Sequence, residues 1–509
     1  MVIPLLIGKT ADDSWRVTRM SKSAAAKANK KTKVSKKAAN RAKRKSHCVE
    51  ISFSDEKVTS FGGMILEHRL AERLGLWRML DEALPGRQGR YGWLDMIKSA
   101  VAGLLTGSRG TFAAEGVRED EALLDMLEIE GAPEEATFWR ALEGLGQMAR
   151  EGVLAKVQES WVRKILSVLS RRDLLECGGF FPVFADGSLL EGSTRREGTK
   201  YLKDKKPGLM WTTIFAGPLV AAQAIAEKGE GEQTLVRRML PDVVERVLKP
   251  LRMQEKALVL ADALHGNEPS LRVVEEQGLR YVVGAGALDA TSRVLEEQPE
   301  SQWHEQGADA KRGWGESAVC LCWIQCAEWP EKRLLVGRRF RRENELFRMN
   351  YGVMTNLTPE DLGTFSDEEF ALAVWRLYDA KGRMELGYQE LLSDLNLHHP
   401  PCREHVRNAG FYAVATLAHT LGVAVKLIGG RADRDHAKRE REKKKRDGVP
   451  PRVLVKPRRG MRLWRVRRNL FALPGRIKRH ARRLRVELLG VSPKLREQFE
   501  RWYGAVCRC

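Results

Sequence analysis

The chain has 509 residues, and 43% of them are hydrophobic, so it is long enough for two or three domains around a large core. Its formal net charge of +21 points to a polyanionic partner, most simply nucleic acid. No run of 18 apolar residues and no convincing signal peptide occur in the sequence, so we expect no membrane span and a cytoplasmic location.

The first part of the chain divides into a basic tail and a helical region. Residues 1–48 are rich in Lys, Ala and Ser, and we expect a disordered tail that neutralises phosphates or only aids solubility. From 49 to 170, apolar residues recur at three- and four-residue spacing between Gly and Pro clusters, which predicts four to six helices. Arg87, Arg90 and Arg109 lie between these helices, so the domain either binds DNA or serves packing alone.

Two apolar runs in residues 171–290 end in an aspartate. FFPVFADGS contains Asp186, and KALVLADALHG contains Asp262. Both runs are typical of strands buried on both faces, and a carboxylate at the end of such a strand lies where ligands usually bind in open α/β sheets. Further strand and helix patterns alternate here, which predicts an α/β domain with a mixed sheet and flanking helices.

Residues 291–365 are predicted to form a β-rich insertion of antiparallel strands. The run GRRFRR contains Arg338, Arg339 and Arg341, and several Trp residues occur nearby. Such a surface could hold a DNA backbone and stack on an unpaired base, although core packing is the more common role of Trp.

Residues 366–430 begin with the sequence SDEEFALAVWRLYDAKGRMELGYQELLSDLNL, which predicts a long helix from about Asp367 to about Leu395. Residues three, four and seven apart share one face of a helix. On this face we expect Tyr378, Lys381, Glu385 and Leu392. A second, apolar helix should follow. Glu385 and the two strand-end aspartates together could hold cations that prefer oxygen ligands.

The last segment, residues 431–509, contains a charged linker followed by a stretch in which Leu and Val alternate with many Arg and Lys residues. We expect this C-terminal part to dock on the body of the protein as a strand or helix while it presents cations to phosphates, or to mediate dimerisation.

The ordered trio of acids resembles that of the DDE transposases of bacterial insertion sequences. One large group of that family carries the pattern Tyr-x2-Arg-x3-Glu-x6-Lys on its Glu-bearing helix. Tyr378 and Glu385 match this pattern, Lys381 replaces the Arg, and Leu392 replaces the final Lys. The resemblance covers roughly residues 55–490, and the missing Lys removes one expected DNA contact unless Arg383 substitutes.

The resemblance implies an RNase H-like core in which Asp186, Asp262 and Glu385 hold Mg²⁺, with Mn²⁺ as a substitute. It implies double-stranded DNA as partner, both the terminal inverted repeats of the element and the target, and a homodimer in a synaptic complex near the bacterial nucleoid. The expected DNA-binding residues are Tyr378, Lys381, Arg383, Arg338, Arg339, Arg341, Lys200 and Lys203.

Two alternatives remain open. A degenerate transposase would only bind DNA, and an RNase H-like nuclease would cleave DNA without joining it to a second molecule. A further residue, His265, stands three positions after Asp262 and could act either as a proton shuttle or in a hydrogen bond at a helix start.

Overall fold

The computed structural model describes two separate units, Met1–Glu56 and Lys57–Cys509. The described residues are 5–9, 15–19, 56–175, 177–201, 207–285, 289–309, 312–326, 329–343, 345–446, 461–480 and 483–509. In the first unit, β1 (Leu5–Lys9) and β2 (Trp15–Arg19) pair as antiparallel strands. The composition of the tail did not predict this hairpin, and the other residues of the expected tail lie outside the described part.

The second unit begins with a series of helices over the region where helices were predicted. Its α-helices are α2 (Ile65–Leu74), α3 (Leu76–Ala83), α4 (Trp93–Thr106), α5 (Glu121–Leu127), α6 (Glu135–Arg150), α7 (Val153–Ser167) and α8 (Arg171–Leu174). Apolar residues from these helices, such as Phe138 and Trp161, are fully buried. Gly75 separates α2 from α3 with a φ of 74°, a left-handed conformation that glycine adopts without steric cost.

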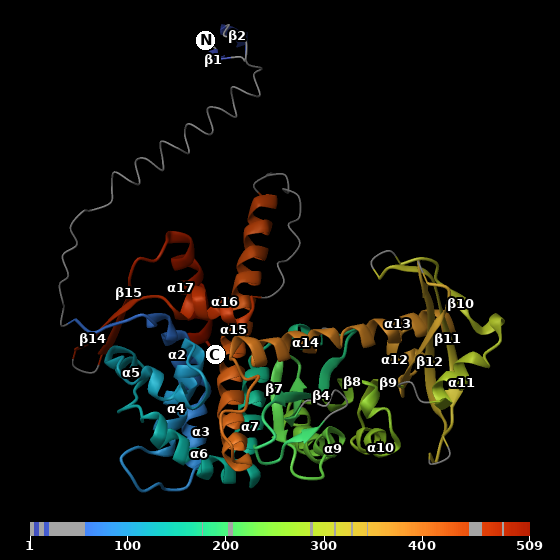
Figure 1. The fold of residues 1–509 in the computed structure, drawn as a ribbon, viewed down its shortest axis with the longest axis horizontal. Helices are drawn as coiled ribbons and strands as arrows, with labels where there is room; N and C mark the ends of the chain where they lie inside the picture. The colour runs from blue at the N-terminus through green and yellow to red at the C-terminus, as the bar shows by residue number, and fades with distance from the viewer. Residues whose placement is uncertain are drawn as a thin grey trace. The chain divides into compact units, whose positions relative to one another are not determined.

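A ten-stranded mixed sheet follows (Figure 1). Its first strands are β4 (Phe181–Glu191), β5 (Lys200–Tyr201), β6 (Pro207–Ala216), β7 (Leu219–Ile225), β8 (Ala257–Ala261) and β9 (Arg280–Gly284). The insertion supplies β10 (His304–Glu305), β11 (Trp314–Ile324), β12 (Arg333–Arg342) and β13 (Met349–Thr355). The strand order is β10-β11-β12-β13-β9-β8-β4-β6-β5, with β7 paired to β6. Strand β8 pairs in parallel with β4 and β9, and the other pairs are antiparallel.

The predicted insertion is therefore not a separate layer. Val353 on β13 pairs with Gly284 on β9, so the antiparallel strands of the insertion extend the same sheet. The helices between the strands are α9 (Glu232–Val243) with its continuation η4 (Val244–Leu248), α10 (Glu268–Glu276), α11 (Asp289–Glu296) and α12 (Pro359–Leu362). The prediction of an α/β fold with one large mixed sheet is confirmed.

The long helix expected from Asp367 to Leu395 is divided. It consists of α13 (Asp367–Asp379), α14 (Gly382–Gln389) and the π-helical turn η8 (Glu390–Asp394) (Figure 1). Between α13 and α14 the backbone hydrogen bonds tighten to a three-residue spacing, as from the Lys381 amide to the Tyr378 carbonyl at 2.9 Å. Gly382, which is a poor helix former, begins α14 at this break.

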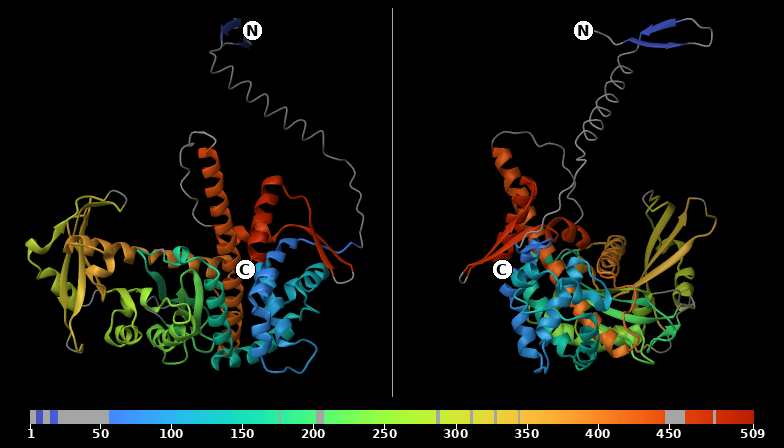
Figure 2. Two further views of the ribbon diagram at one scale, coloured as in Figure 1. Left: turned by 180° about the vertical axis from the view of Figure 1, so that it is seen from behind. Right: turned by 60° about the vertical axis from the view of Figure 1, so that its left-hand side comes forward.

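The helix α15 (His405–Arg446) runs through the centre of the second unit and contacts α4, α6, α17 and β7 (Figure 2). By length and composition it could cross a membrane, but 89% of its most apolar window is buried inside the protein. That burial is the pattern of a core helix. Fully buried Tyr412 and Leu421 are among the side chains that α15 places in the core.

The C-terminal segment docks on the body, as expected. It comprises α16 (Leu463–Val466), η9 (Arg467–Phe471), β14 (Gly475–His480), β15 (Arg483–Leu488) and α17 (Pro493–Cys507), and β14 also pairs with β3 (Val58–Thr59). The start of this segment rests on two buried acids of η8. The Leu463 amide donates to Glu390, which also pairs with Lys426 at 2.6 Å, and Arg462 pairs with Asp394.

The next cation along the segment, Arg467, contacts three separate carbonyl groups. It donates hydrogen bonds to the carbonyls of Leu104 and Leu105 on α4 and of Asp394 on η8. One side chain of the C-terminal segment therefore joins the helical region to the end of the Glu-bearing helix.

Candidate active site

The two predicted aspartates lie next to each other in the sheet. Ala185 on β4 is the register partner of Ala261 on the parallel strand β8, so Asp186 and Asp262 follow at the same level. The prediction that Asp186 ends its strand is wrong, because β4 continues to Glu191 by pairing with β6. It does lie where the pairing with β8 ends, so both carboxylates stand at the carboxyl edge of the parallel strands.

A third carboxylate comes from α9. Glu232 begins this helix, is only 6% exposed, and lies with Asp262 and His265 in a group whose potential ligand atoms are within 4.8 Å of one another. Gly187 makes this approach possible, because a Cβ at that position would lie 2.4 Å from Oε2 of Glu232. The glycine of the FADGS motif thus leaves room for the carboxylate beside Asp186.

His265 orients that carboxylate. Its Nε2 forms a 2.8 Å hydrogen bond with Oε1 of Glu232, and the ring is 97% buried, as its exposed fraction is 3%. Its Nδ1 is buried without a hydrogen-bond partner among the described residues. The capping hydrogen bond at this helix start is made instead by Asp262, which accepts from the Leu264 amide at 2.9 Å. The ring of His265 therefore does not make the helix-start hydrogen bond that was one of the two alternatives for this residue.

The site carries an excess of negative charge. Burial above all, together with the nearby carboxylates of Glu232 and Asp262, raises the pKa of Asp186 to about 6, although the Lys381 ammonium and the Gly187 amide act to lower it. Asp186 thus interacts with two further carboxylates and one lysine in a partly buried setting. Burying such like charges together is unfavourable unless a cation binds between them.

The Glu-bearing helix approaches these acids from another side. The hydroxyl of Tyr388 donates to the carbonyl of Asp186 at 2.6 Å and lies 2.6 Å from the hydroxyl of Thr213, which is the β6 partner of Asp186. The pKa of Tyr378 is raised by burial and then by the charges of Asp262 and Asp186, so its hydroxyl lies within the electrostatic range of both acids. Together with Lys381, these two tyrosines attach the helix to the aspartates.

The third predicted acid, Glu385, lies in the first turn of α14 and is exposed. It forms no hydrogen bond or ion pair with any other residue that the structure describes. Lys381 precedes it by four positions and Tyr388 follows by three, and residues so spaced share a helix face. Both neighbours act on Asp186, but Glu385 is not in the group formed by Glu232, Asp262 and His265, so the structure leaves it on the exposed surface of α14.

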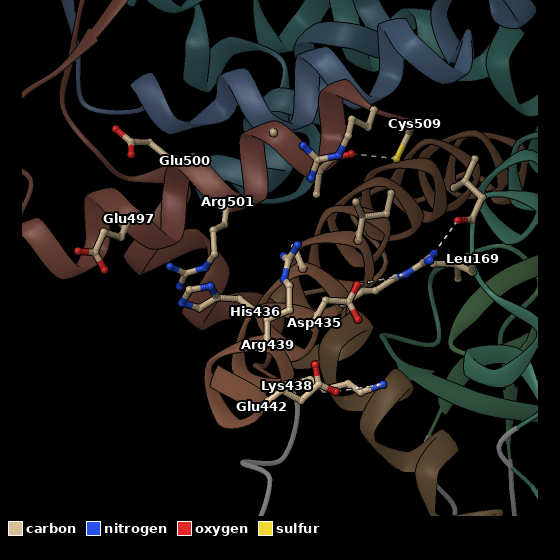
Figure 3. A pocket seen from close by; sticks show the side chains of 17 residues that line it. Leu169, Asp435, His436, Lys438, Arg439, Glu442, Glu497, Glu500, Arg501 and Cys509 are labelled. Atoms are coloured by element: carbon tan, nitrogen blue, oxygen red, sulfur yellow. Dashed lines mark hydrogen bonds and ion pairs between the residues drawn. The ribbon is translucent and has the colours of Figure 1, made fainter. Parts of the chain in front are cut away.

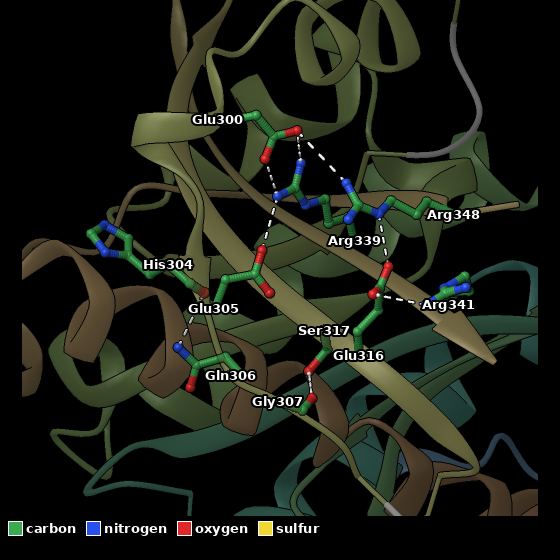
Figure 4. A network of polar contacts seen from close by, with 10 residues as sticks. All are labelled: Glu300, His304, Glu305, Gln306, Gly307, Glu316, Ser317, Arg339, Arg341 and Arg348. Atoms are coloured by element: carbon green, nitrogen blue, oxygen red, sulfur yellow. Dashed lines mark hydrogen bonds and ion pairs between the residues drawn. The ribbon is translucent and has the colours of Figure 1, made fainter. Parts of the chain in front are cut away.

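The arginines of the insertion are bound largely to other residues of the insertion itself (Figure 4). Arg339 is 8% exposed and donates to Glu300 and Glu305, and Arg341 donates to Glu316 at 3.1 Å. Arg338 lies over the rings of Trp314 and Trp375, at 5.5 and 4.5 Å from their centroids. Arg338 and Arg339 thus have structural partners, and a role in DNA binding stays a prediction for all three arginines.

The remaining predicted residues are scattered. Arg383 is exposed and donates to the thiol of Cys177 at 3.8 Å, and Lys200 pairs with Gly208 at the start of β6. Lys203 lies outside the described residues. Leu392 stands in the π-helical turn and packs partly buried against the core, so an apolar side chain suits that position.

Sequence analysis missed Glu232 and Tyr388 as site residues. Glu232 stands at a helix start in GEQTLVRRML, where an acid is ordinarily explained by its favourable interaction with the helix dipole. Tyr388 stands three residues after Glu385 on the same helix, and that spacing could have indicated it. No local pattern reveals that Glu232 reaches His265, because their approach depends on the packing of α9 beside β4 and η6 (Ala263–His265).

A separate pocket lies between α15 and α17 (Figure 3). Its charged lining residues are Arg431, Asp435, His436, Lys438, Arg439, Glu442, Glu497, Glu500, Arg501 and Arg508. Charges of both signs alternate there, and pairs such as Lys438 and Glu442 lie within 3.9 Å of each other. This balance favours neither an anion nor a cation, so the pocket does not compete with the acidic site as a metal centre.

No protein-family model matches the chain, and no curated protein matches it. Among solved structures, a cryo-EM structure of the piggyBac transposase synaptic complex with hairpin DNA is similar over 73% of this chain and 77% of that chain. The sequence identity is 11% and the TM-score is 0.36, values too low to establish a common fold or activity.

Proposed function

We propose that the chain is a DNA transposase of the DDE type, with an RNase H-like core, that cleaves the ends of its insertion sequence and transfers the 3′ ends to target DNA. The observation that carries this proposal is the parallel register of β4 and β8, which sets Asp186 beside Asp262, with Glu232 within reach of the second aspartate. The net charge of +21 supports a polyanionic substrate. The proposed setting is a homodimer on DNA in the bacterial cytoplasm.

The donor set fits divalent cations such as Mg²⁺ or Mn²⁺. Carboxylate oxygens are the ligands that these hard cations prefer, and the acids outnumber the single lysine that acts on Asp186. Asp186 and Asp262 would be the main ligands, with Glu232 behind them and Glu385 at the rim. Bound there, two such cations would activate the attacking hydroxyl and stabilise the leaving oxygen.

The other side chains act by position and charge. Lys381 offsets the carboxylate charge at Asp186, and its ammonium group would attract a phosphate of the bound strand. Tyr388 fixes the backbone of Asp186 through its 2.6 Å hydrogen bond. His265 holds the Glu232 carboxylate in one orientation. These residues would keep the acids in a fixed geometry while the DNA is bound.

The test is cleavage and joining of DNA that carries the flanking element ends, with Mg²⁺, for the wild type and for Asp186→Asn. Joined product from the wild type alone supports the proposal. Cleavage without joining would favour the RNase H-like nuclease, and DNA binding with neither reaction would favour the degenerate transposase. Exposed Lys256→Gln serves as a control that should leave both reactions unchanged.

A further inference from the structure

The strands β14 and β15 form a ribbon with unlike faces, here called the C-terminal ribbon, which β3 extends to a three-stranded sheet only beside Gly475 and Arg476. They pair in continuous register from Gly475 and Leu488 to His480 and Arg483. Register partners share a face, and successive residues alternate between faces. One face carries Ile477, Arg479, Leu484, Val486 and Leu488. The other carries Arg476, Lys478, Arg483, Arg485 and one acid, Glu487.

The apolar face is attached to the body of the protein. Ile477 is 5% exposed, and a Cβ on Gly62 would lie 3.0 Å from the side chain of Leu488. Arg479, on the same face, donates to the carbonyl of Asp125 at 3.0 Å. This packing fixes how the ribbon is turned, so the opposite, basic face is directed outward.

The outward face concentrates positive charge, with Glu487 as its single acid. Lys478 lies directly across from Arg485, and like charges at such positions destabilise a strand pair. Lys478, Arg483 and Arg485 are exposed. None of the three forms a hydrogen bond or ion pair with a carboxylate of the described part of the chain. An external polyanion would therefore remove a repulsion that the folded chain retains.

We propose that the basic face of the C-terminal ribbon binds double-stranded DNA through its phosphates. Cations along two adjacent strands form a firm, narrow surface, and the major groove of B-form DNA admits a two-stranded ribbon between its phosphate rows. The inference rests on the proposed function only for the choice of DNA as the polyanion. It assigns to the ribbon the binding of the duplex, a role separate from that of the acidic site.

Binding without metal tests the proposal independently of cleavage. Fluorescence anisotropy with a duplex of about 30 base pairs, in EDTA, would follow affinity from about 50 to about 300 mM KCl. The variant carries Lys478→Gln, Arg483→Gln and Arg485→Gln. The control carries Arg78→Gln, Arg172→Gln and Lys256→Gln, which remove the same charge from exposed positions on other elements.

We expect the ribbon variant to lose at least about tenfold in affinity at low salt and about 2–3 units of the log–log salt slope, because each lost phosphate contact contributes about 0.9. The control should change affinity less than about threefold. Equal losses in both variants would overturn the proposal, since general attraction would then account for binding. Equally tight binding of a single strand of the same length would overturn the assignment to duplex DNA.

A measurement on the wild type covers the case in which the ribbon variant does not fold. Acetylation of lysines by an amine-reactive reagent, with and without duplex, should show protection of Lys478 and none of Lys256. Full reactivity of Lys478 in the complex would contradict the proposal. Asp186→Asn should keep the protection and the salt slope, so a failure of the proposed catalysis remains distinguishable from a failure of the ribbon.

Discussion

Asp186 and Asp262 are adjacent because the residues before them, Ala185 and Ala261, are register partners on two parallel strands. A shift of one residue in this register would separate the carboxylates and turn one of them to the opposite face of the sheet. The candidate site therefore depends on the pairing of β4 with β8 as directly as on the acids themselves.

Glu232→Gln should weaken Mn²⁺ binding by about 10- to 100-fold, because the variant keeps the shape of the side chain but loses a carboxylate beside Asp262. Isothermal titration calorimetry with Mn²⁺ measures the change. Glu276→Gln, an exposed acid on α10, is the matched control and should leave the affinity unchanged. Wild-type affinity in the Glu232 variant would remove Glu232 from the site.

Glu385→Gln should abolish cleavage and leave DNA binding intact. Glu385 is exposed and forms no hydrogen bond or ion pair with another described residue. The free energy of unfolding of the variant should therefore stay within about 0.5 kcal/mol of that of the wild type. Gel-based cleavage and anisotropy on the same preparation separate the two activities. Equal loss of cleavage and binding would count against a catalytic role.

Tyr388→Phe should destabilise the protein by about 1–3 kcal/mol, because the carbonyl of Asp186 and the buried hydroxyl of Thr213 both lose a partner. Urea denaturation measures the effect, and Tyr351→Phe, on a half-exposed ring, is the control. Cleavage should fall as well, since Asp186 would be held less firmly. An unchanged cleavage rate would limit Tyr388 to a structural role.

Glu67→Gln should remove a pH dependence of stability. Burial raises the pKa of Glu67 from 4.5 to about 8, partly offset by Lys98, so near neutral pH the folded chain keeps a proton that the unfolded chain has released. Stability of the wild type should therefore fall as pH rises towards about 8, by about 1 kcal/mol between pH 7 and 8.

The range above pH 7 isolates Glu67 from its neighbour His68, whose pKa burial lowers to about 4. Denaturation at pH 7 and pH 9 should show a loss of stability in the wild type and little or none in the variant. A variant that loses as much as the wild type would mean that another group causes the dependence.

Arg339→Gln should lower stability by about 1–3 kcal/mol without changing the salt dependence of DNA binding, because its guanidinium is bonded to Glu300 and Glu305. Thermal unfolding and anisotropy measure the two effects. Arg341→Gln, at a more exposed position of the same strand, is the comparison. If Arg339→Gln reduced the log–log salt slope of DNA binding by about 0.9, the predicted contact between Arg339 and DNA would be supported.

Local patterns predicted the elements well where hydrophobic periodicity was clear. The helices of residues 49–170 are a typical case, because each buries a regular apolar face. The break at Ala380 and Lys381 was not predicted, since a single glycine within a helical pattern usually costs only about 1 kcal/mol.

The site was also predictable only in part, because sequence patterns describe single elements and not the packing between them. Asp186 and Asp262 follow recognisable strands, so their neighbourhood could be inferred. Glu232 comes close to Asp262 only through packing between elements distant in sequence, and the partners of Arg339 at Glu300 and Glu305 depend on strand pairing that periodicity does not specify.

The C-terminal segment is an integral part of the folded second unit, because it binds the two buried acids of η8. A chain cut within residues 447–460 would lack Arg462 and Arg467, leaving Asp394 without these cationic partners, while Glu390 would keep Lys426. Asp394 lies six residues after Tyr388, the residue that donates to the carbonyl of Asp186. The end of the chain thus holds the helical segment that follows Tyr388, and we expect shortening of the protein to disturb the acidic site from a distance.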